Sequence, residues 1–365
     1  MMSTPLPRRP ALGLLTADAS AGRANAQPEP GEPLELVASF DQQVTGVAVA
    51  PSGRIFVNFP RWEQDVAISV AEVMKDGTLK PYPNAEWNRW TDAQPLSNAD
   101  HFVCVQSVTV DPQGFLWILD PAAPGNEFNL DGGPKVLKVD LATDHVIRTY
   151  PFDRAVCPQG SYLNDIRVSP DGKTAYLTDS GVKGALLVLD TASGKVRRLL
   201  EDHPSTQVEK QVKVTVESTP LKRADGRGPM FAADGIALSK DGSQLYWQAL
   251  TGKTMYCIST KALLGHDAAA AVKTLGTGCV ADGYWMDRKD RLWITSPEDN
   301  SVKRRMPDGS LQTAAKDDRL RWPDSMAEGP DGAIYVTASH IQDMAQFTGK
   351  PRQGKTELFR FVPPA

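Results

Sequence analysis

The sequence lacks several features that mark common classes of protein. Only 4 of its 365 residues are cysteine and 5 are histidine, and the cysteines have no C-x-x-C spacing, which argues against a thiolate zinc site. No run approaches the ~18 consecutive apolar residues of a membrane-spanning helix. The 40 Lys and Arg residues are balanced by 44 Asp and Glu residues, so no broad cationic surface is available for nucleic acid. We therefore expect no membrane insertion and no nucleic-acid partner.

Sequence motifs of several enzyme classes are also missing. The chain has no G-x-S-x-G elbow, Walker loop or H-E-x-x-H pair, so serine-hydrolase, nucleotide-binding and zinc-protease functions lack support. Hydrophobic residues make up 41% of the chain and charged residues 23%, which is typical of a globular protein with a real core.

The first 33 residues differ in composition from the rest. Arg8 and Arg9 precede a short apolar stretch, and Ala24-Asn25-Ala26 has the small-x-small form of a signal-peptidase site. We predict that residues 1–33 are an export signal or a disordered tail, and that residues 34–365 form one domain. A signal would place the protein outside the cell or in the periplasm; a tail would leave it in the cytoplasm.

One pattern occurs six times along the chain. Each copy reads as a strand, a turn rich in Pro, Asp and Gly, and a second strand rich in β-branched and aromatic residues. The copies begin at Thr45, Gln106, Asn164, Asp234, Asp282 and Asp324. A second hairpin lies between successive copies, for example ALLVLDTASGKVRRLL from Ala185, so each repeat supplies four strands.

Four-stranded units repeated around an axis are the signature of a β-propeller. Six repeats predict an all-β, six-bladed propeller. The last repeat lacks a fourth strand, while LELVASF from Leu34 has no partner in its own repeat. We predict that this amino-terminal strand closes the ring.

The repeat places polar residues at equivalent positions. The first strand of a propeller blade is innermost, so the six residues that begin the copies should ring one mouth of the central channel. The second strand returns to the same face and should bring further side chains to this rim, as should a loop before Gln106. These additional rim residues are Asp120, Asp179, His340 and His101.

Three aspartates at one channel mouth require compensation, because burial and like charges raise carboxyl pKa values unless a cation intervenes. One candidate is Ca²⁺ or another divalent cation, which takes carboxylate and amide oxygens as ligands. A second is the ammonium group of a ligand. In a third interpretation, the aspartates cap turns by accepting hydrogen bonds from backbone N–H groups.

Several long motifs resemble the yellow and major royal jelly protein family, which is close to the senescence marker protein and gluconolactonase propellers. The resemblance is carried by Phe102-VCVQSV, Leu163-NDI with Ala175-YLTDSG, Ala233-DGIALSKDG and Gly329-PDGAIYVTASH. It implies a six-bladed propeller, often secreted, in a family that includes dopachrome-converting proteins and binders of biogenic amines.

The resemblance to gluconolactonases also implies a metal position. Asn164 and Asp234 match the asparagine and aspartate motifs that hold a divalent ion in that group. Thr45 stands where those proteins have a glutamate, and Gln106 where they have an asparagine, so this chain matches only two of that group's metal-ligand positions. His340 departs from the yellow pattern, in which an asparagine commonly follows the strand.

Two of the four cysteines are placed where a disulfide could form. Cys104 and Cys157 both precede innermost strands of adjacent repeats, so a disulfide between them is conceivable, with four free thiols as the alternative.

The residues predict a small-molecule site at the channel mouth. Our leading hypothesis is an enzyme that hydrolyses a lactone or ester, or isomerises a cyclic aromatic substrate, with Asp234, Asp282 or His340 handling a proton. Gln106, Asp324, Asp179, Asp120 and His101 would contact the ligand. The alternative is a binder of small amines without turnover, and a third possibility is a protein-interaction propeller.

Overall fold

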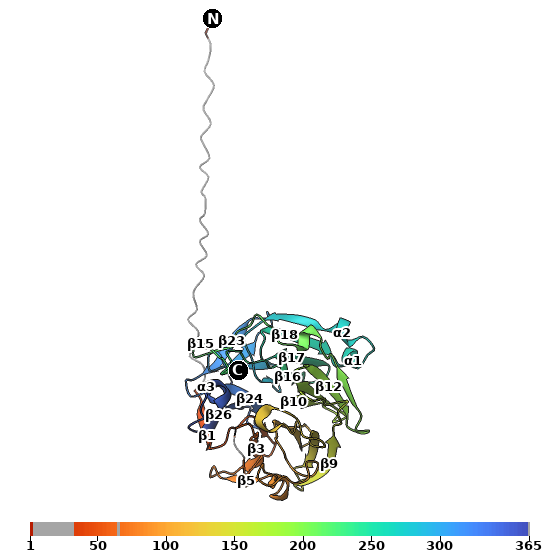
Figure 1. Ribbon diagram of the computed structural model, residues 1–365. Coiled ribbons are helices and arrows are strands. Elements are labelled where there is room, and N and C mark those ends of the chain that lie inside the picture. Colours follow the sequence, from red (N-terminus) through yellow and green to blue (C-terminus); the bar gives the residue numbers. More distant parts are fainter. Residues whose placement is uncertain (3–32, 64–65, 364–365) are drawn as a thin grey trace.

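Six sheets of four antiparallel strands form a ring in the computed structural model (Figure 1). The structure describes residues 1–2, 33–63 and 66–363. The innermost strand of each sheet contacts the innermost strands of both neighbouring sheets, including β2 (Val47–Val49) with β24 (Pro323–Glu328), which joins the first blade to the last. The predicted six-bladed propeller is confirmed. The predicted export signal or tail lies outside the described residues except at 1, 2 and 33.

In the first five blades, the strands follow one another in the sequence from the channel outward. The first blade continues from β2 with β3 (Ile55–Asn58), β4 (Val70–Val73) and β5 (Leu79–Pro81). The second contains β6 (Ser107–Val110), β7 (Phe115–Asp120), β8 (Lys135–Asp140) and β9 (His145–Pro151). The third contains β10 (Leu163–Val168), β11 (Thr174–Asp179), β12 (Ala185–Asp190) and β13 (Val196–Leu199).

The fourth and fifth blades repeat this order. The fourth contains β16 (Ala233–Leu238), β17 (Gln244–Ala249), β18 (Thr254–Ser259) and β19 (Lys273–Thr277). The fifth contains β20 (Tyr284–Met286), β21 (Leu292–Ser296), β22 (Ser301–Arg305) and β23 (Leu311–Lys316).

The sixth blade closes the ring with strands from both ends of the chain. It combines β24, β25 (Ile334–Ala338) and β26 (Thr356–Phe361) with β1 (Glu35–Phe40) as its outermost strand. β1 pairs antiparallel with β26, from Glu35 opposite Arg360 to Phe40 opposite Thr356. The prediction that the amino-terminal strand closes the ring is confirmed.

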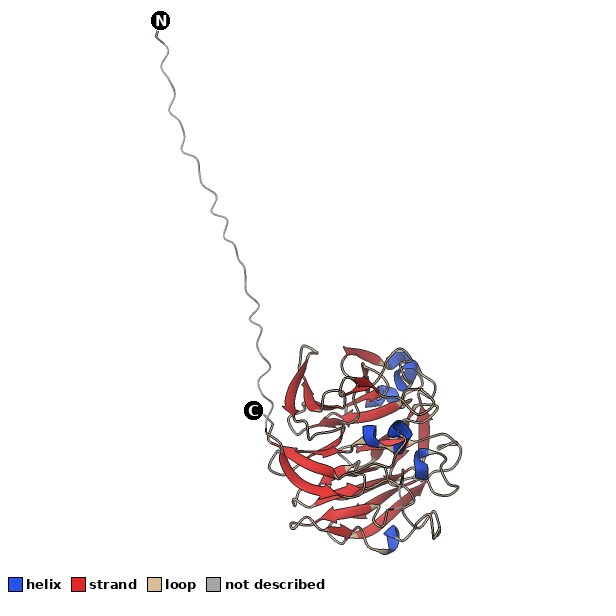
Figure 2. Cartoon of the chain, turned by 60° about the vertical axis from the view of Figure 1, so that its left-hand side comes forward, coloured by secondary structure: helices blue, strands red, loops and turns tan. Residues whose placement is uncertain are grey.

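Short helices and one small hairpin lie in the connections between strands (Figure 2). The helices are η1 (Glu86–Asn88), η2 (Pro124–Asn126), η3 (Pro204–Thr206), α1 (Thr260–Leu263), α2 (Ala268–Ala271), η4 (Ile341–Asp343) and α3 (Ala345–Thr348). The hairpin pairs β14 (Thr215–Val216) with β15 (Thr219–Pro220). Among the described residues, no helix has the length and apolar character needed to cross a membrane.

The turns between the first two strands of each blade explain the repeated Asp and Gly residues. In the second blade, the carboxylate of Asp111 accepts hydrogen bonds from the backbone N–H groups of Gln113 and Phe115, and Gly114 adopts φ +87°. Asp290 replaces this glycine in the fifth blade and adopts φ +59°, a left-handed conformation that aspartate tolerates better than most residues. The repeat thus depends on turn geometry rather than on glycine alone.

Apolar side chains between adjacent blades form the core. Trp117, Trp247 and Trp293 are fully buried at equivalent positions on the second strands of their blades. Trp117 packs with side chains of the third blade, such as Leu163 and Ile166. Each indole N–H is satisfied, for example by Asp111 at 2.8 Å from Trp117. The interpretation of these tryptophans as core residues is confirmed.

Candidate functional site

A cavity of about 370 Å³ lies where the innermost strands begin. Five of the six polar residues that begin the repeats line it, each from a different blade. They are Gln106, Asn164, Asp234, Asp282 and Asp324. The sequence register therefore correctly predicted that these side chains converge at one channel mouth.

The sixth residue of the register, Thr45, does not line the cavity. Its hydroxyl is buried, donates to the backbone oxygen of Gln106 at 3.0 Å and accepts from Asn58 Nδ2 at 2.8 Å. In the first blade, the hydroxyl group of this residue is therefore used in hydrogen bonds within the protein and is not available to a ligand.

The Asp-Gly pairs of the register have a packing reason. A Cβ atom at Gly283 would lie 2.1 Å from the backbone oxygen of Asp324, and one at Gly235 would lie 2.4 Å from that of Asp282. Real Cβ contacts are never this short, so the glycine lets neighbouring innermost strands approach closely. This approach brings the aspartates of adjacent blades together.

The three aspartates form an electrostatically coupled cluster. Burial raises the pKa of Asp234 well above its usual value, and the charges of Asp282 and Asp324 raise it further. The carboxyl groups of Asp234 and Asp282 are hydrogen-bonded to each other. Burial raises the pKa of Asp282 to about 7, although the indole of Trp322, which donates to Asp282 Oδ2 at 2.5 Å, opposes this shift.

Asp324 completes the cluster beside Asp282. Its carboxylate accepts hydrogen bonds from the hydroxyl groups of Ser339 at 2.9 Å and Ser325 at 3.1 Å. Burial still raises its pKa well above the usual value, and the charge of Asp282 adds to this effect. At neutral pH the cluster consequently holds protons that three isolated aspartates would have lost.

A fourth buried carboxylate, which the sequence reasoning missed, lies on the innermost strand β10. Asp165 accepts a hydrogen bond from Ser107 Oγ at 2.6 Å and pairs with Arg167 at 3.1 Å. Its charge raises the pKa values of Asp234, Asp282 and Asp324. The available signal was its place directly after Asn164 on an innermost strand.

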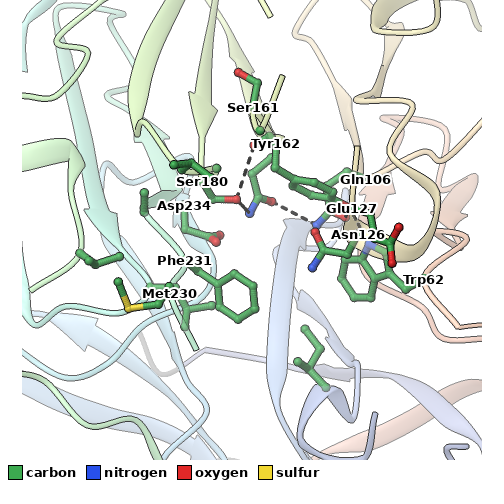
Figure 3. A pocket seen from close by; sticks show the side chains of 18 of the residues that line it. Trp62, Gln106, Asn126, Glu127, Ser161, Tyr162, Ser180, Met230, Phe231 and Asp234 are labelled. Atoms are coloured by element: carbon green, nitrogen blue, oxygen red, sulfur yellow. Dashed lines mark hydrogen bonds between the residues drawn. The ribbon is translucent and has the colours of Figure 1, made fainter. Parts of the chain in front are cut away.

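A chain of hydrogen bonds orients the amide side chains (Figure 3). Trp62 Nε1 donates to Tyr162 Oη at 2.6 Å, and this hydroxyl donates to Gln106 Oε1 at 2.9 Å. Gln106 Nε2 donates to Asn164 Oδ1 at 3.1 Å, and Asn164 Nδ2 donates to Ser180 Oγ at 3.1 Å. Both amides are thus fixed by neighbours on each side.

Apolar side chains from loops form the rest of the wall. Trp62, Tyr162 and Phe231 border the same cavity as Asp234 (Figure 3). The lip is unusually exposed for apolar residues, with Phe128 at 65%, Met230 at 51% and Val182 at 83% exposure. No pattern in the sequence singled out these residues, because they lie in loops outside the repeat.

Two predicted rim aspartates are part of the framework instead of the cavity wall. Asp120 is fully buried and accepts from the backbone N–H groups of Val103, Cys104 and Ala122 and from Lys135 Nζ at 2.8 Å. The same role belongs to Asp179, which accepts from Arg198 Nη1 and from the N–H groups of Tyr162 and Gly181. Both carboxylates hold loops in place, so the structure gives no geometric support to their predicted ligand contacts.

The two predicted rim histidines also lie outside the cavity lining. His101 Nδ1 is 3.0 Å from Ser97 O, and its Nε2 is 3.3 Å from a carboxylate oxygen of Glu86. His340 Nε2 is 2.9 Å from Glu357. Burial lowers the pKa of His340, but hydrogen bonds to Asp343 and Glu357 raise it more, and the net shift is upward. Neither His340, predicted to act in catalysis, nor His101, predicted to bind the ligand, is therefore among the side chains that line this cavity.

The oxygen atoms of the cavity do not form a divalent-cation site in this arrangement. Asn164 Oδ1 already accepts from Gln106, and Asp234 is hydrogen-bonded to Asp282. Within the described part of the chain, no three His, Cys, Asp or Glu side chains are grouped so that they could hold one ion. The predicted metal ligands Asn164 and Asp234 thus do not fit a metal without rearrangement.

All four cysteines are free thiols. Burial raises the pKa values of Cys104 and Cys157 to about 12, so both remain protonated at neutral pH. The conceivable disulfide between them is not formed in this structure.

The fold and the site define a class: six-bladed β-propellers with an acidic cavity, of the size of a small molecule, at one mouth of the channel. The family model of the major royal jelly protein matches residues 103–358. The chain belongs to this family, as the sequence resemblance predicted.

Two relatives from Apis mellifera are similar at the sequence level. Major royal jelly protein 5 is 26% identical over 236 residues, which are 60% of this chain and 36% of that protein. Major royal jelly protein 7 is 26% identical over 190 residues, which are 50% of this chain and 40% of that protein. The matches therefore span well under half of either relative.

Solved structures with the same fold include enzymes and a calcium-binding protein. A gluconolactonase from Xanthomonas campestris is 14% identical, with a TM-score of 0.56 and coverage of 98% of this chain and 99% of that chain. A luciferin-regenerating enzyme is 12% identical, with a TM-score of 0.57 and coverage of 91% and 95%. The calcium-binding protein regucalcin from Agrobacterium tumefaciens is 16% identical, with a TM-score of 0.54 and coverage of 90% and 94%. At these identities the likeness establishes the fold.

Proposed function

We propose that this protein is an enzyme that isomerises a small cyclic or aromatic molecule by proton transfer between two buried carboxyl groups. The hydrogen-bonded pair of Asp234 and Asp282 carries the proposal. Two carboxyl groups that hold their protons to different pH values supply an acid and a base in one site. With a pKa of about 7 at Asp282, the pair works near neutral pH.

The reaction we propose is a tautomerisation. The carboxylate of Asp282 removes a proton from a carbon next to a substrate carbonyl group. The neutral carboxyl group of Asp234 donates its proton to the carbonyl oxygen, which gives an enol. One proton leaves the substrate and one enters, so no water, metal or redox partner is consumed. After the enol leaves, the proton that Asp282 has taken passes to Asp234 between the two neighbouring carboxyl groups, which restores both aspartates.

The remaining cavity wall suits a flat ring. Trp62, Tyr162 and Phe231 offer aromatic surface, and Gln106 and Asn164 present fixed amide groups. A volume of about 370 Å³ is appropriate for one small molecule. The exposed apolar lip formed by Phe128, Val182 and Met230 would contact a substituent that extends from the ring.

The test is carbon-bound proton exchange. A panel of cyclic and aromatic ketones and lactones is incubated with the protein in D₂O, and proton NMR follows the loss of the C–H signal beside the carbonyl group. We expect exchange with at least one aromatic ketone, reduced about 100-fold or more in Asp282→Asn. Asp241→Asn, an exposed carboxylate, is the matched control. Equal exchange by wild type and Asp282→Asn would refute the proposal.

A second candidate function is binding of an amine without turnover. Aromatic side chains beside a cluster of carboxyl groups also suit an ammonium group. The positive charge of the ligand would lower the carboxyl pKa values and favour the ionised carboxylates. Calorimetry with phenethylamine separates the two candidates. Tight, saturable binding that Asp234→Asn abolishes, together with no exchange on any ketone, would favour the binder.

Lactone hydrolysis assisted by a divalent cation is the remaining hypothesis from the sequence. It requires Asn164 and Asp234 to leave their present hydrogen bonds. Chelator-treated protein is unfolded thermally with Ca²⁺, Mg²⁺ or Mn²⁺ added, because a ligand that binds only the native state raises the melting temperature. We expect no change; a saturable rise that Asn164→Ala removes would restore the metal hypothesis.

A further inference from the structure

The three aspartates of the acidic cavity have different hydrogen-bond partners. Asp282 Oδ2 accepts from the indole N–H of Trp322 at 2.5 Å. Asp324 accepts from the hydroxyl groups of Ser339 and Ser325. The carboxyl group of Asp234 is hydrogen-bonded to that of Asp282, and no other partner is found for it among the described residues. A nitrogen donor therefore contacts one of the three carboxyl groups.

This difference in donor type favours different protonation states. An indole N–H can only donate, whereas a serine hydroxyl can donate to a carboxylate or accept from a neutral carboxyl group. A hydrogen bond from a nitrogen is strongest when the accepting carboxyl group is ionised. The partner of Asp282 thus favours its carboxylate, while the partners of Asp324 suit either state.

Ionisation of Asp282 also decides where the shared proton lies. A carboxylate can only accept, so the proton between the two carboxyl groups belongs to Asp234 and is donated to Asp282. In agreement, their mutual hydrogen bond raises the pKa of Asp234 and lowers the pKa of Asp282. One indole N–H therefore bears on the state of both groups.

Trp322 is held firmly in the position from which it donates. It precedes β24 of the sixth blade, is fully buried and adopts φ +54°, a left-handed conformation that is rare for a bulky side chain. Its backbone oxygen accepts from Ser339 N at 3.0 Å. Its ring packs with Ile341 and Met344, which line the acidic cavity. Such a conformation persists only where the surroundings fix it, and it often occurs at functional sites.

We propose that Trp322 is a positioning residue that makes Asp282 the base of the pair and keeps the proton on Asp234. Trp322 is not among the side chains that line the cavity, so it acts through Asp282 and not on the substrate. The N–H is already aimed at the carboxylate, so no reorganisation is needed when Asp282 ionises. This inference rests on the proposed isomerase for the roles of acid and base, but the order of ionisation is measurable without a substrate.

The test is carbon-13 NMR of the aspartate carboxyl groups in the full chain, followed against pH. Asp282→Asn and Asp234→Asn identify the two signals. In wild type, we expect Asp282 to ionise at lower pH than Asp234. In Trp322→Phe, which keeps an aromatic ring and removes the N–H, the midpoint of Asp282 should rise by about 1–2 pH units. Trp117→Phe is the matched control, because it removes an indole bond to Asp111 far from the cavity lining and should leave the midpoint unchanged.

Two further readouts follow from the same bond. The indole N–H signal of Trp322 in wild type should shift with the same midpoint as the carboxyl carbon of Asp282, and this measurement decides even if Trp322→Phe does not fold. The acidic limb of the carbon-bound proton exchange profile should move to higher pH in Trp322→Phe, with exchange at pH 6 reduced about 10-fold or more.

Three results would overturn the proposal. They are an unchanged midpoint of Asp282 in folded Trp322→Phe, an equal rise in Trp117→Phe, and a wild-type indole signal of Trp322 that does not respond when Asp282 ionises. Failure of the isomerase itself would look different. No exchange on any ketone, together with the shifted midpoint, would refute the isomerase and leave the control of Asp282 ionisation by Trp322 in place.

Discussion

At the scale of single residues, Asp282 has the most informative environment. Its pKa is about 7 in the folded protein, against about 4 in an unfolded chain. Between these values the folded state binds more protons than the unfolded state, so the stability that this group contributes falls as pH rises. This contribution to stability is fully present below about pH 4 and is lost above about pH 7.

We predict that Asp282→Asn removes this pH dependence. Asparagine is neutral at every pH and keeps an oxygen for the indole of Trp322. Relative to the variant, wild type should lose up to about 1.4 kcal/mol in free energy of unfolding per pH unit between pH 5 and 7. Urea denaturation at half-unit pH steps measures it. A constant difference between the two proteins would contradict the raised pKa.

Asp120 provides a contrasting prediction, because its carboxylate is bound to Lys135 deep in the second blade. Replacing it with alanine leaves a buried ammonium group without its counter-charge. We expect Asp120→Ala to lower the free energy of unfolding by about 3–5 kcal/mol. The exposed pair of Arg89 and Glu86 gives the control, since Arg89→Ala should cost under about 1 kcal/mol. Denaturant titration compares them, and similar costs would mean that the buried pair is not structural.

At the scale of elements, contact between the innermost strands depends on Gly283 and its equivalents. Alanine at Gly283 would force its Cβ against the backbone of Asp324, which lines the cavity. We predict that Gly283→Ala lowers the free energy of unfolding by about 1–3 kcal/mol through overpacking. At Gly228 the nearest atom to a new Cβ is 3.8 Å away, so Gly228→Ala is the control. If the two variants melt at the same temperature, close strand approach is not required.

At the scale of the whole molecule, closure of the ring depends on the contact between β1 and the first blade. The ring of Phe40 is buried and packs edge-on against Phe59, with centroids 5.3 Å apart. We predict that Phe40→Ala costs about 3–5 kcal/mol. Leu36→Ala on the exposed part of the same strand should cost much less. Equal, small losses in calorimetry would show that the closing strand contributes little to stability.

Patterns in the amino-acid sequence were enough to predict the architecture and the core of the site. Turn residues, strand alternation and the sixfold repeat are local signals, so they predicted the blades, the closing strand and the convergence of Asp234, Asp282 and Asp324. An equivalent position in each repeat becomes an equivalent position around one axis. The repeat could not show whether a polar side chain faces the cavity or forms hydrogen bonds and ion pairs with neighbouring side chains.

Contacts between strands and loops of the folded ring determine which polar residues face the cavity. Asp120 and Asp179 follow the register of the rim, yet Lys135 and Arg198, from other strands, bind them away from the cavity. The walls contributed by Trp62 and Phe231 come from loops that carry no period. The raised pKa values of Asp234 and Asp282 depend on burial and on two neighbouring blades that bring the two carboxyl groups close together. These properties depend on the distances between side chains of different blades and on the burial of those side chains. Both arise only when the chain folds, so the local sequence pattern does not predict them.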